Sequence, residues 1–201
     1  SVTIPCQCRY VPMPIPAMPS WQLRSVATSD VEDQAEWISG WSQRYHQLSA
    51  GPFQGGGEYI ELPGLHLFFE TFNRRVHQAG TPPAGCLALS HLLTTVEEGW
   101  LCGEPVGSSA AVLLQPRSEF HFRTPIEATV ATVVLDASLA LQIADEIGLR
   151  EPLDRALGSK VIPLPAASRQ ALCDAVHKTR ELAHTQAASR ASGGRWRQSG
   201  E

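Results

Sequence analysis

The sequence predicts a mainly β fold with some helix, in which an antiparallel β-barrel is followed by a pair of helices. Two patterns predict this fold class. Between residues 41 and 135, short runs of alternating apolar and polar residues are separated by Pro- and Gly-rich turns. They recur roughly every ten residues, which is typical of antiparallel sandwiches and barrels. After residue 136 the apolar residues recur at intervals of three and four, which indicates helix.

The composition excludes several classes of protein. The chain has 201 residues, 43% of them hydrophobic, and a net charge of −4, which suits one packed domain with a helical extension. A domain that binds nucleic acid by itself is expected to carry a basic excess, and this one does not. No apolar run approaches the roughly 20 residues that span a bilayer, and the first residues lack the features of a signal peptide. Five scattered cysteines suit reduced thiols, so we expect a cytoplasmic protein without a membrane segment.

Residues 1–20 are predicted to form a Pro-rich arm. Residues 11–19, VPMPIPAMP, alternate proline with apolar residues. Because proline fixes φ and lacks an amide donor, this segment is expected to be extended. It is either a frayed terminus or an arm that lies across a pocket or a partner.

The first elements after the arm are predicted to be two strands around a short helix. Trp21–Thr28 is a candidate strand. Ser29 and Glu32 have the form of a capping box, so a helix is expected from there until Gly40 ends it. Alternation resumes at Trp41 and predicts the next strand.

The stretch Tyr45–Asn73 is expected to contain the first hairpin. Its two strand-like runs, Glu58–Leu62 and Leu65–Phe72, are joined by the turn dipeptide Pro63-Gly64 and preceded by a glycine-rich loop, Gly51–Gly57. Neither face of the second run is wholly polar, so that strand is predicted to be covered on both sides.

Glu70 stands between two phenylalanines in the second run of this hairpin. We expect its carboxylate to pair with an arginine, such as Arg74 or Arg75, at the barrel rim. The alternative is a carboxylate that meets a cationic or hydroxylated ligand.

Further strands are predicted to complete a barrel over residues 21–136. They are Cys86–Leu93, Gly99–Gly103, Ser109–Leu114, Glu119–Arg123 and Ala128–Leu135. In the fourth of these the two phenylalanines share one face, and His121 lies on the other. His121 lacks the His-x-His partner that a metal-binding cupin shows, and Cys6 and Cys8 lack a second ligand pair. The barrel is therefore predicted to hold no metal and no other cofactor.

Residues 137–186 are predicted to form two helices that dimerise. Asp136 caps the first helix, and the second is expected from about Ala167 to Thr185. The apolar positions of the second helix form a narrow seam suited to one partner helix; they are Leu172, Val176, Thr179 and Ala183. Residues 187–201 are Ser- and Gly-rich and are expected to be a linker to an absent DNA-binding domain.

Two kinds of function find little support in local motifs. Residues 141–157 have the outline of a helix-turn-helix, but the charges of the second segment roughly cancel, so DNA contact through this unit is not expected. The sequence contains no Gly-x-Ser-x-Gly elbow, P-loop or dinucleotide fingerprint. We therefore predict no catalytic residue.

The order of these elements resembles the N-terminal effector domains of AraC-type transcription regulators, in particular the branch of the ethanolamine-utilisation regulator. The resemblance extends in pattern over about residues 25–185 and is specific mainly over 41–73. The matching residues are Trp41, Tyr45, Gln47, Leu48, Gly51, Phe53, Gly55, Glu70, Val134, Leu135 and Asp136. It implies a cupin-like antiparallel β-barrel that binds a small effector, a homodimer through the following helices, and a C-terminal helix-turn-helix domain for promoter DNA. Because the chain stops at Glu201 before any such domain, we expect an excised effector domain.

The leading hypothesis is a ligand-sensing and dimerisation domain of a bacterial one-component transcription regulator, not an enzyme. Small-molecule sites combine aromatic walls with a few polar anchors. The residues expected near the pocket are Trp41, Tyr45, Phe69, Glu70, Trp100 and His121. The alternatives are a cupin-type enzyme, such as an isomerase or dioxygenase, and a dimerisation module with an empty barrel.

Overall fold

The computed structural model describes residues 22–193 of the chain, and the side chains of residues 22–190. Three predictions fall wholly or partly outside this range. They concern the Pro-rich arm of residues 1–20, Trp21 of the first predicted strand, and residues 194–201 of the predicted linker.

Within residues 22–193 the chain forms twelve strands and four helices. In chain order they are β1 (Gln22–Thr28), α1 (Val31–Glu36), β2 (Ser42–Gln47), β3 (Gly55–Leu62), β4 (Leu65–Phe72), β5 (Val76–Thr81), β6 (Cys86–Thr94), β7 (Gly99–Leu101), β8 (Glu104–Val106), β9 (Ala110–Leu114), β10 (Phe120–Arg123), β11 (Ala128–Asp136), α2 (Ala137–Glu146), α3 (Arg150–Ala156), β12 (Val161–Pro163) and α4 (Ala166–Gly193). The change from strands to helices at Asp136 agrees with the prediction.

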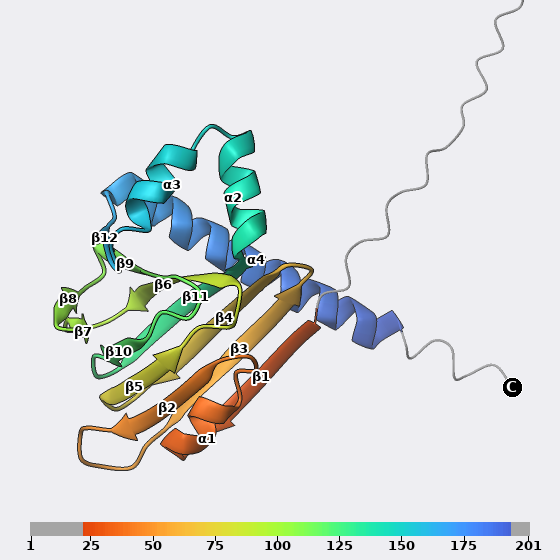
Figure 1. Ribbon diagram of the computed structural model, residues 1–201. Coiled ribbons are helices and arrows are strands. Elements are labelled where there is room, and N and C mark those ends of the chain that lie inside the picture. The colour runs from red at the N-terminus through yellow and green to blue at the C-terminus, as the bar shows by residue number, and fades with distance from the viewer. Residues whose placement is uncertain (1–21, 194–201) are drawn as a thin grey trace, which may run out of the picture.

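The strands form two antiparallel sheets that face each other (Figure 1). One sheet has seven strands in the order β1-β3-β4-β11-β6-β9-β12, and the other has five in the order β2-β5-β10-β7-β8. The main hydrophobic core lies between them and includes Tyr45, Phe68, Phe72, Phe120 and Phe122. A mainly β fold with antiparallel sheets is therefore confirmed.

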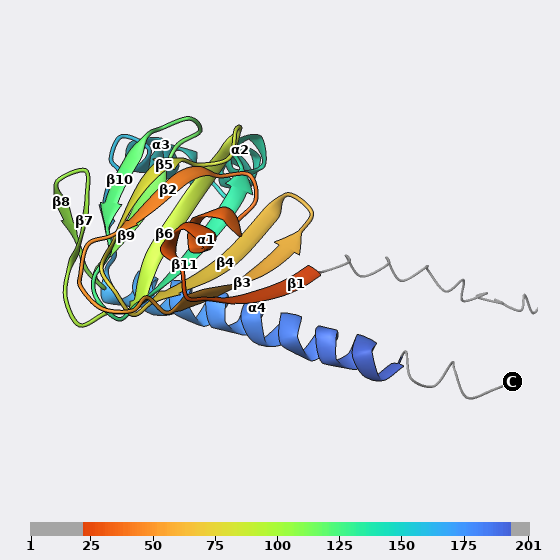
Figure 2. The same cartoon turned by 90° about the horizontal axis from the view of Figure 1, so that it is seen from below.

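The two sheets do not close into a barrel, which corrects that part of the prediction. No strand pairing joins the two sheets among the described residues. The edge strands β1 and β2 belong to different sheets, and α1 lies between them (Figures 1 and 2). Ala35 of α1 and Ile38 just after it are buried in the core there. Because these side chains occupy the gap, β1 and β2 cannot hydrogen-bond to each other.

The hairpin of β3 and β4 agrees closely with the prediction. Leu62 pairs with Leu65 across the Pro63-Gly64 turn, where Gly64 has a φ of +74°. β4 is covered on both faces, since Phe68 and Phe72 enter the main core while Leu67 and Phe69 enter a second cluster on the outer side. This two-sided burial is confirmed.

β3 begins at Gly55, three residues before the predicted start, so part of the predicted glycine-rich loop is strand. Gly57 pairs with Glu70 on β4. A Cβ added at Gly57 would lie 2.2 Å from Cζ2 of Trp37 and 2.5 Å from the carbonyl oxygen of Phe69. The strand therefore needs glycine here because the Trp37 ring packs directly on the backbone.

Replacing Gly57 with alanine is expected to lower the free energy of unfolding by about 2 kcal/mol, since the added methyl group overlaps packed atoms. Gly107→Ala is the matched control, because its Cβ would meet nothing closer than 3.6 Å, and its effect is expected to stay within about 0.5 kcal/mol. Urea unfolding of both variants measures the difference. Equal effects would show that the packing of Trp37 on β3 is not tight.

α4 packs along the outer face of the seven-stranded sheet, beneath β1, β3 and β4 in Figure 2. Val176 and Ala183 are buried there, and Leu172 packs against the same cluster. Thr179 lies outside that cluster and donates its hydroxyl hydrogen to the carbonyl oxygen of Ala175. The seam predicted to bind a partner helix therefore contacts the chain's own sheet, which corrects the role predicted for these residues, while dimerisation itself stays a prediction. The physical reason is that the outer face of β3, β4 and β11 is apolar and needs cover.

An ion pair between Arg180 of α4 and Glu58 of β3 links the helix to the sheet beside this cluster. Arg180 donates two hydrogen bonds to the carboxylate of Glu58, at 2.6 and 2.8 Å, and its guanidinium lies 4.8 Å from the centroid of the Phe69 ring. His184 Nε2 lies 3.1 Å from Glu58 Oε2. The hydrogen bonds from Arg180 lower the pKa of Glu58. α4 also continues past its predicted end at Thr185, so residues 187–193 of the predicted linker are helical.

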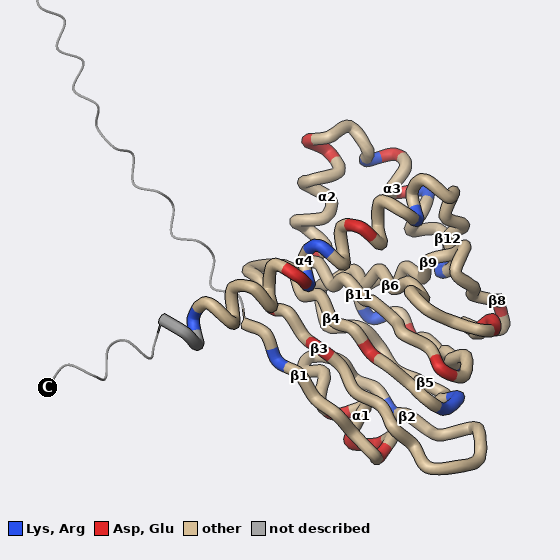
Figure 3. Tube along the Cα trace, turned by 180° about the vertical axis from the view of Figure 1, so that it is seen from behind, with Lys and Arg blue, Asp and Glu red and all other residues tan. Residues whose placement is uncertain are grey.

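α2 and α3 follow β11, so three helices rather than a pair follow the strands. Asp136 caps α2 by accepting hydrogen bonds from the backbone amides of Ser138 and Leu139, as predicted. Acidic residues at the end of α2 are followed by acidic and basic residues side by side along α3 (Figure 3), and Arg150 pairs with both Asp145 and Asp154. These internal pairs agree with the predicted cancellation of charge in this segment.

Three local features differ from the sequence predictions. β5, an interior strand of the five-stranded sheet, and the short strand β12 were not predicted. β5 has few apolar residues, and its strand form depends on β2 and β10 pairing on either side. Asp30, not Ser29, is the N-cap of α1, because its carboxylate accepts from the amides of Glu32 and Asp33.

Candidate functional site

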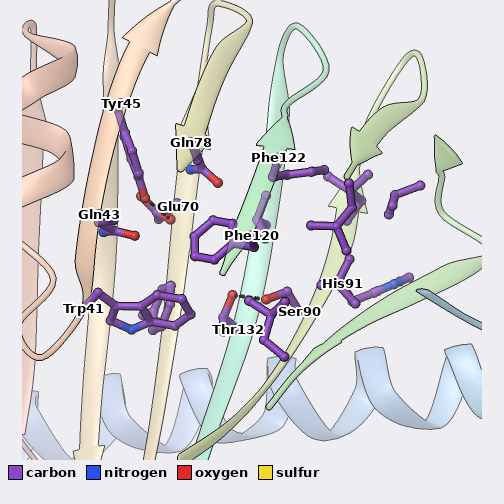
Figure 4. A pocket seen from close by; sticks show the side chains of 17 residues that line it. Trp41, Gln43, Tyr45, Glu70, Gln78, Ser90, His91, Phe120, Phe122 and Thr132 are labelled. Carbon is purple, nitrogen blue, oxygen red and sulfur yellow. Dashed lines mark hydrogen bonds between the residues drawn. The ribbon is translucent and has the colours of Figure 1, made fainter. Parts of the chain in front are cut away.

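A cavity lies between the two sheets (Figure 4). It is lined by Trp41, Gln43, Tyr45, Phe68, Glu70, Gln78, Ser90, His91, Leu92, Leu101, Val106, Val112, Leu114, Phe120, Phe122, Val130 and Thr132. Its volume open to solvent is about 40 Å³, which is enough for about three water molecules. Most of its wall is apolar, so the few polar groups in it determine what it can bind.

Four polar side chains gather at one end of the cavity, as Figure 4 shows. Gln43 and Tyr45 come from alternate positions of β2, Glu70 from β4 and Gln78 from β5. Alternate residues of a strand point to the same face, which explains why Gln43 and Tyr45 enter together. β2 and β5 are neighbours in one sheet, while β4 supplies Glu70 from the opposite sheet.

The carboxyl of Glu70 is the central polar group at this end, and Glu70 is only 4% exposed. Its Oε1 accepts a hydrogen bond from Gln34 Nε2 at 3.3 Å and from the Tyr45 hydroxyl at 3.1 Å. The same hydroxyl lies 3.2 Å from Oε2. Burial raises the pKa of Glu70 to about 7, although the hydrogen bonds from Gln34 and Tyr45 act in the opposite direction. The carboxyl group therefore titrates near neutral pH.

The predicted arginine partner of Glu70 is wrong. Arg75 pairs instead with Glu97 at 2.6 Å, and Arg74 Nη1 donates to the backbone carbonyl of Asn73. Glu70 thus faces the cavity with uncharged donors and no cationic partner among the described residues. The alternative, in which the carboxylate meets a ligand, stays a prediction.

Tyr45 acts as a neutral donor in this group. Burial, followed by the proximity of Glu70, raises the pKa of its hydroxyl well above the ordinary value. The phenol therefore keeps its hydrogen over the physiological range and can donate it to Glu70. Behind it, Gln34 of α1 donates both to Glu70 and to the backbone carbonyl of Gly56.

Gln78 carries a buried hydrogen-bond donor without a partner. The residue is 6% exposed, and its Nε2 has no hydrogen-bond acceptor among the described residues. A buried donor left unpaired costs about 1–3 kcal/mol. A ligand or a water molecule that offers an acceptor in the cavity would remove this cost.

A second, smaller polar group lies across the cavity, on the far side of Phe120 in Figure 4. The hydroxyls of Ser90 and Thr132 are 2.9 Å apart, and His91 Nδ1 lies 2.9 Å from the carbonyl oxygen of Ala110. Because a carbonyl can only accept, His91 Nδ1 carries the hydrogen. In the neutral ring, Nε2 is then an acceptor.

Aromatic rings separate and enclose these polar groups. The ring of Trp41 meets Phe68 and Phe120 edge to face, with centroids 5.7 and 5.9 Å apart, and Phe122 completes the wall. Edge-to-face packing holds such rings in defined positions. The cavity therefore has rigid apolar walls and one strongly polar end.

The structure brings together three of the six residues predicted near the pocket, namely Trp41, Tyr45 and Glu70. Phe69 does not line the cavity; it lies on the opposite face of β4, in the cluster with α4. Trp100 and His121 also lie elsewhere. His121 is exposed and stacks on His77, and Trp100 is 38% exposed beneath Arg123.

Sequence reasoning missed Gln34, Gln43 and Gln78 as members of the site. Gln43 shares a strand face with Trp41 and Tyr45, so the alternation of β2 could have identified it. Gln78 lies in a strand that was not predicted, and Gln34 reaches Glu70 from a helix 36 residues earlier in the chain. No local signal indicates either contact.

Two features are absent from the described residues. No three His, Cys, Asp or Glu side chains among them are grouped so as to hold a metal ion. Over residues 22–193, none of the helices combines the length and the apolar character that crossing a membrane requires.

No family model matches the chain. Among solved structures, the AraC-like transcriptional activator CuxR has a similar fold, with a TM-score of 0.50 and 9% sequence identity. The match covers 65% of this chain and 52% of that chain, so this chain spans about half the length of CuxR. At this identity the likeness concerns the fold alone. An oxalate decarboxylase matches 60% of this chain and 40% of its own at 16% identity, but its TM-score of 0.28 carries no argument.

Proposed function

We propose that this chain is the ligand-sensing domain of a bacterial one-component transcription regulator of the AraC type. It binds a small effector between the two sheets and passes the binding event to a DNA-binding domain outside this chain. The observation that carries the proposal is the polar end of the cavity. There, the buried Glu70 carboxyl and the Gln78 side chain, whose Nε2 has no partner among the described residues, line a cavity with aromatic walls.

Stability alone does not account for this arrangement. A protein interior normally pairs its buried polar groups with one another, and an unpaired buried group lowers stability. Here an acid without a cationic partner and a side-chain amide whose Nε2 lacks an acceptor line the same cavity. Sites that bind small molecules combine apolar walls with a few such convergent polar groups.

The fold likeness to CuxR supports the regulator class. The finer assignment to the branch of the ethanolamine-utilisation regulator stays a prediction from residues 41–73. A cytoplasmic location, a cupin-like fold, and promoter binding through a C-terminal helix-turn-helix domain belong to the same proposal. A homodimer also belongs to it, and its contact has to use a surface other than the seam of α4 that packs on the sheet.

The proposal describes a binding protein without catalytic activity. Its mechanism is a shift of population, because an effector changes the regulator only as far as it binds one arrangement of the domain better than another. The alternative from the sequence, a cupin-type isomerase or dioxygenase, predicts a different result. Stoichiometric iron, manganese or zinc in the purified protein would favour that enzyme.

A thermal-shift screen of small amines, neutral polar molecules and small acids tests the sensing proposal. We expect at least one class to raise the melting temperature at millimolar concentration, since a ligand that binds only the folded state stabilises it. If no class raises the melting temperature, and no compound perturbs the NMR signals of cavity residues, the sensing proposal is wrong.

Gln78→Leu provides a variant that separates binding in the cavity from binding elsewhere. Removing the unpaired donor is expected to raise the stability of the free protein by about 1 kcal/mol and to reduce the shift caused by a cavity ligand. His121→Leu is the matched control, because His121 is exposed on the outer face of the five-stranded sheet. An unchanged ligand shift in Gln78→Leu would place the ligand outside the cavity.

A further inference from the structure

Two histidine rings, those of His77 and His121, meet on the outer face of the five-stranded sheet. His77 lies on β5, and His121 lies on the neighbouring strand β10, where it pairs with Ala79. His77 and His121 are therefore diagonal neighbours on antiparallel strands, a position from which long side chains can touch. Sequence reasoning found no partner for His121, because its partner lies in a strand that was not predicted.

The facing nitrogens of the two rings are separated by the distance expected of two ligands on one zinc ion. His121 Nδ1 is 3.3 Å from His77 Nε2, and the two rings are within 7° of parallel. Two nitrogens that bind a tetrahedral Zn²⁺ at about 2.0–2.1 Å are about 3.3 Å apart. A square-planar ion, the geometry typical of Cu²⁺, would bring them to about 2.8 Å. The observed separation therefore fits tetrahedral zinc.

Both rings can present a lone pair at these nitrogens. A neutral imidazole carries its hydrogen on one nitrogen, and the other nitrogen is an acceptor. Burial lowers the pKa of His77, and the nearby His121 and His46 act in the same direction, so His77 is mostly neutral above pH 7. Without a metal, one ring has to donate a hydrogen to the other. A zinc ion takes the place of that hydrogen and accepts a lone pair from each ring.

The surroundings of the pair leave room for a hydrated ion and limit its affinity. Both rings line an open depression, together with Trp100, Cys102, Gly103 and Arg123. Among the described residues no third His, Cys, Asp or Glu joins the pair to complete a metal-binding group, so water has to fill the remaining positions. Arg123 is a cation and opposes a second positive charge nearby. Zinc is therefore expected to bind more weakly here than at a structural site with four protein ligands.

We propose that His77 and His121 bind a Zn²⁺ ion on the outer face of the five-stranded sheet, with water in its remaining positions. The ion links β5 to β10 and exchanges with the solvent. The effector cavity lies between the two sheets, so this site does not depend on the proposed function and can fail without it. Only zinc that stays bound after both histidines are replaced would favour the cupin-type enzyme.

An NMR titration with ZnCl₂ at about pH 7.5, where free imidazole is mostly neutral, tests the inference. Zinc is expected to shift the ring signals of His77 and His121 together, with one saturation curve. Mg²⁺, which prefers oxygen ligands, is expected to shift neither ring. If zinc leaves both rings unchanged, or if Mg²⁺ has the same effect as zinc, the inference is wrong.

His77→Gln and His121→Gln identify the ligands. Each variant removes one ligand nitrogen and is expected to weaken zinc binding at least about tenfold. His177→Gln is the control, because His177 is exposed on α4, and it is expected to bind zinc as the wild type does. His121 is exposed, so His121→Gln keeps the test valid even if His77→Gln folds poorly. Unchanged zinc affinity in His121→Gln would contradict the inference.

Thiols also bind zinc, and two further variants separate them from the imidazoles. Cys102→Ser removes the thiol of the depression, whose Sγ lies 3.7 Å from Lys160 Nζ. Cys6→Ser/Cys8→Ser removes the two thiols near the start of the sequence. Both variants are expected to leave the zinc titration of the two rings unchanged. If either weakens it as much as His121→Gln does, zinc depends on a thiol and the pair is not the site.

Discussion

Replacing Glu70 with glutamine is expected to raise the free energy of unfolding at pH 8 by up to about 3 kcal/mol. The pKa of this buried carboxyl rises from 4.5 to about 7 in the folded protein, and each pKa unit corresponds to about 1.4 kcal/mol. At pH 8 the folded protein has to hold an unpaired carboxylate in its interior. The amide of glutamine removes that charge and preserves the hydrogen bonds from Gln34 and Tyr45.

The pH dependence follows from proton linkage. Between pH 4.5 and about 7 the folded state binds this proton more tightly than the unfolded state does. The contribution of Glu70 is therefore most favourable below pH 4.5, declines as the pH rises through this window, and is constant above it. The gain from Glu70→Gln should accordingly be large at pH 8 and small at pH 4.5.

Urea unfolding of the wild type and of Glu70→Gln at several pH values from about 4.5 to 8 measures this difference. The exposed Glu104→Gln is expected to follow the wild-type curve throughout. A difference between wild type and Glu70→Gln that does not change with pH would contradict the raised pKa. A stabilised Glu70→Gln would show that this buried acid lowers the stability of the protein.

Replacing Val176 with aspartate is expected to lower the free energy of unfolding by about 3 kcal/mol or more, since it places a charge in a buried apolar contact. Val176 is buried between α4 and the outer face of the sheet, in the cluster with Phe69 and Ile60. The loss should appear as earlier urea unfolding and as faster hydrogen exchange along α4. It should not depend on protein concentration, because the contact lies within one chain.

Leu182→Asp is the matched control, because Leu182 belongs to the same helix but is 46% exposed. The same substitution there is expected to leave the free energy of unfolding within about 0.5 kcal/mol of the wild type. Light scattering of both variants tests the dimer at the same time. If Val176→Asp yields stable, fully folded monomers from a wild-type dimer, the seam is an intermolecular contact and its packing on the sheet is wrong.

Strand alternation correctly predicts on which face of β4 each side chain lies. The period of two in Leu65–Phe72 predicted that both faces of β4 are covered, and the two hydrophobic clusters confirm it. The same rule places Phe69 and Glu70, as neighbours in one strand, on opposite faces. The two residues cannot line the same pocket. Once Glu70 was assigned to the cavity, the sequence alone was therefore enough to exclude Phe69 from it.

Other contacts depend on residues far apart in the chain. Arg75 pairs with Glu97 rather than with Glu70, and α4 covers Phe69 through Val176. Nothing in the seam of α4 indicates whether it packs on another helix or on a sheet, because both partners present apolar surface. α4 packs on the sheet because the apolar outer face of the seven-stranded sheet has to be shielded from water.

The sequence by itself determined the class of fold, the β3–β4 hairpin, the helix cap at Asp136 and the unusual placement of Glu70 between two phenylalanines. These features depend on neighbouring residues, and backbone geometry translates their periodicity directly into strands, turns and helices. Only the tertiary structure decided that α1 keeps the sheets open, that α4 packs on its own sheet, and that Glu70 lines the cavity beside Tyr45 and Gln34 instead of pairing with an arginine. Those outcomes depend on which distant segments lie side by side, and burial, not local propensity, determines that arrangement.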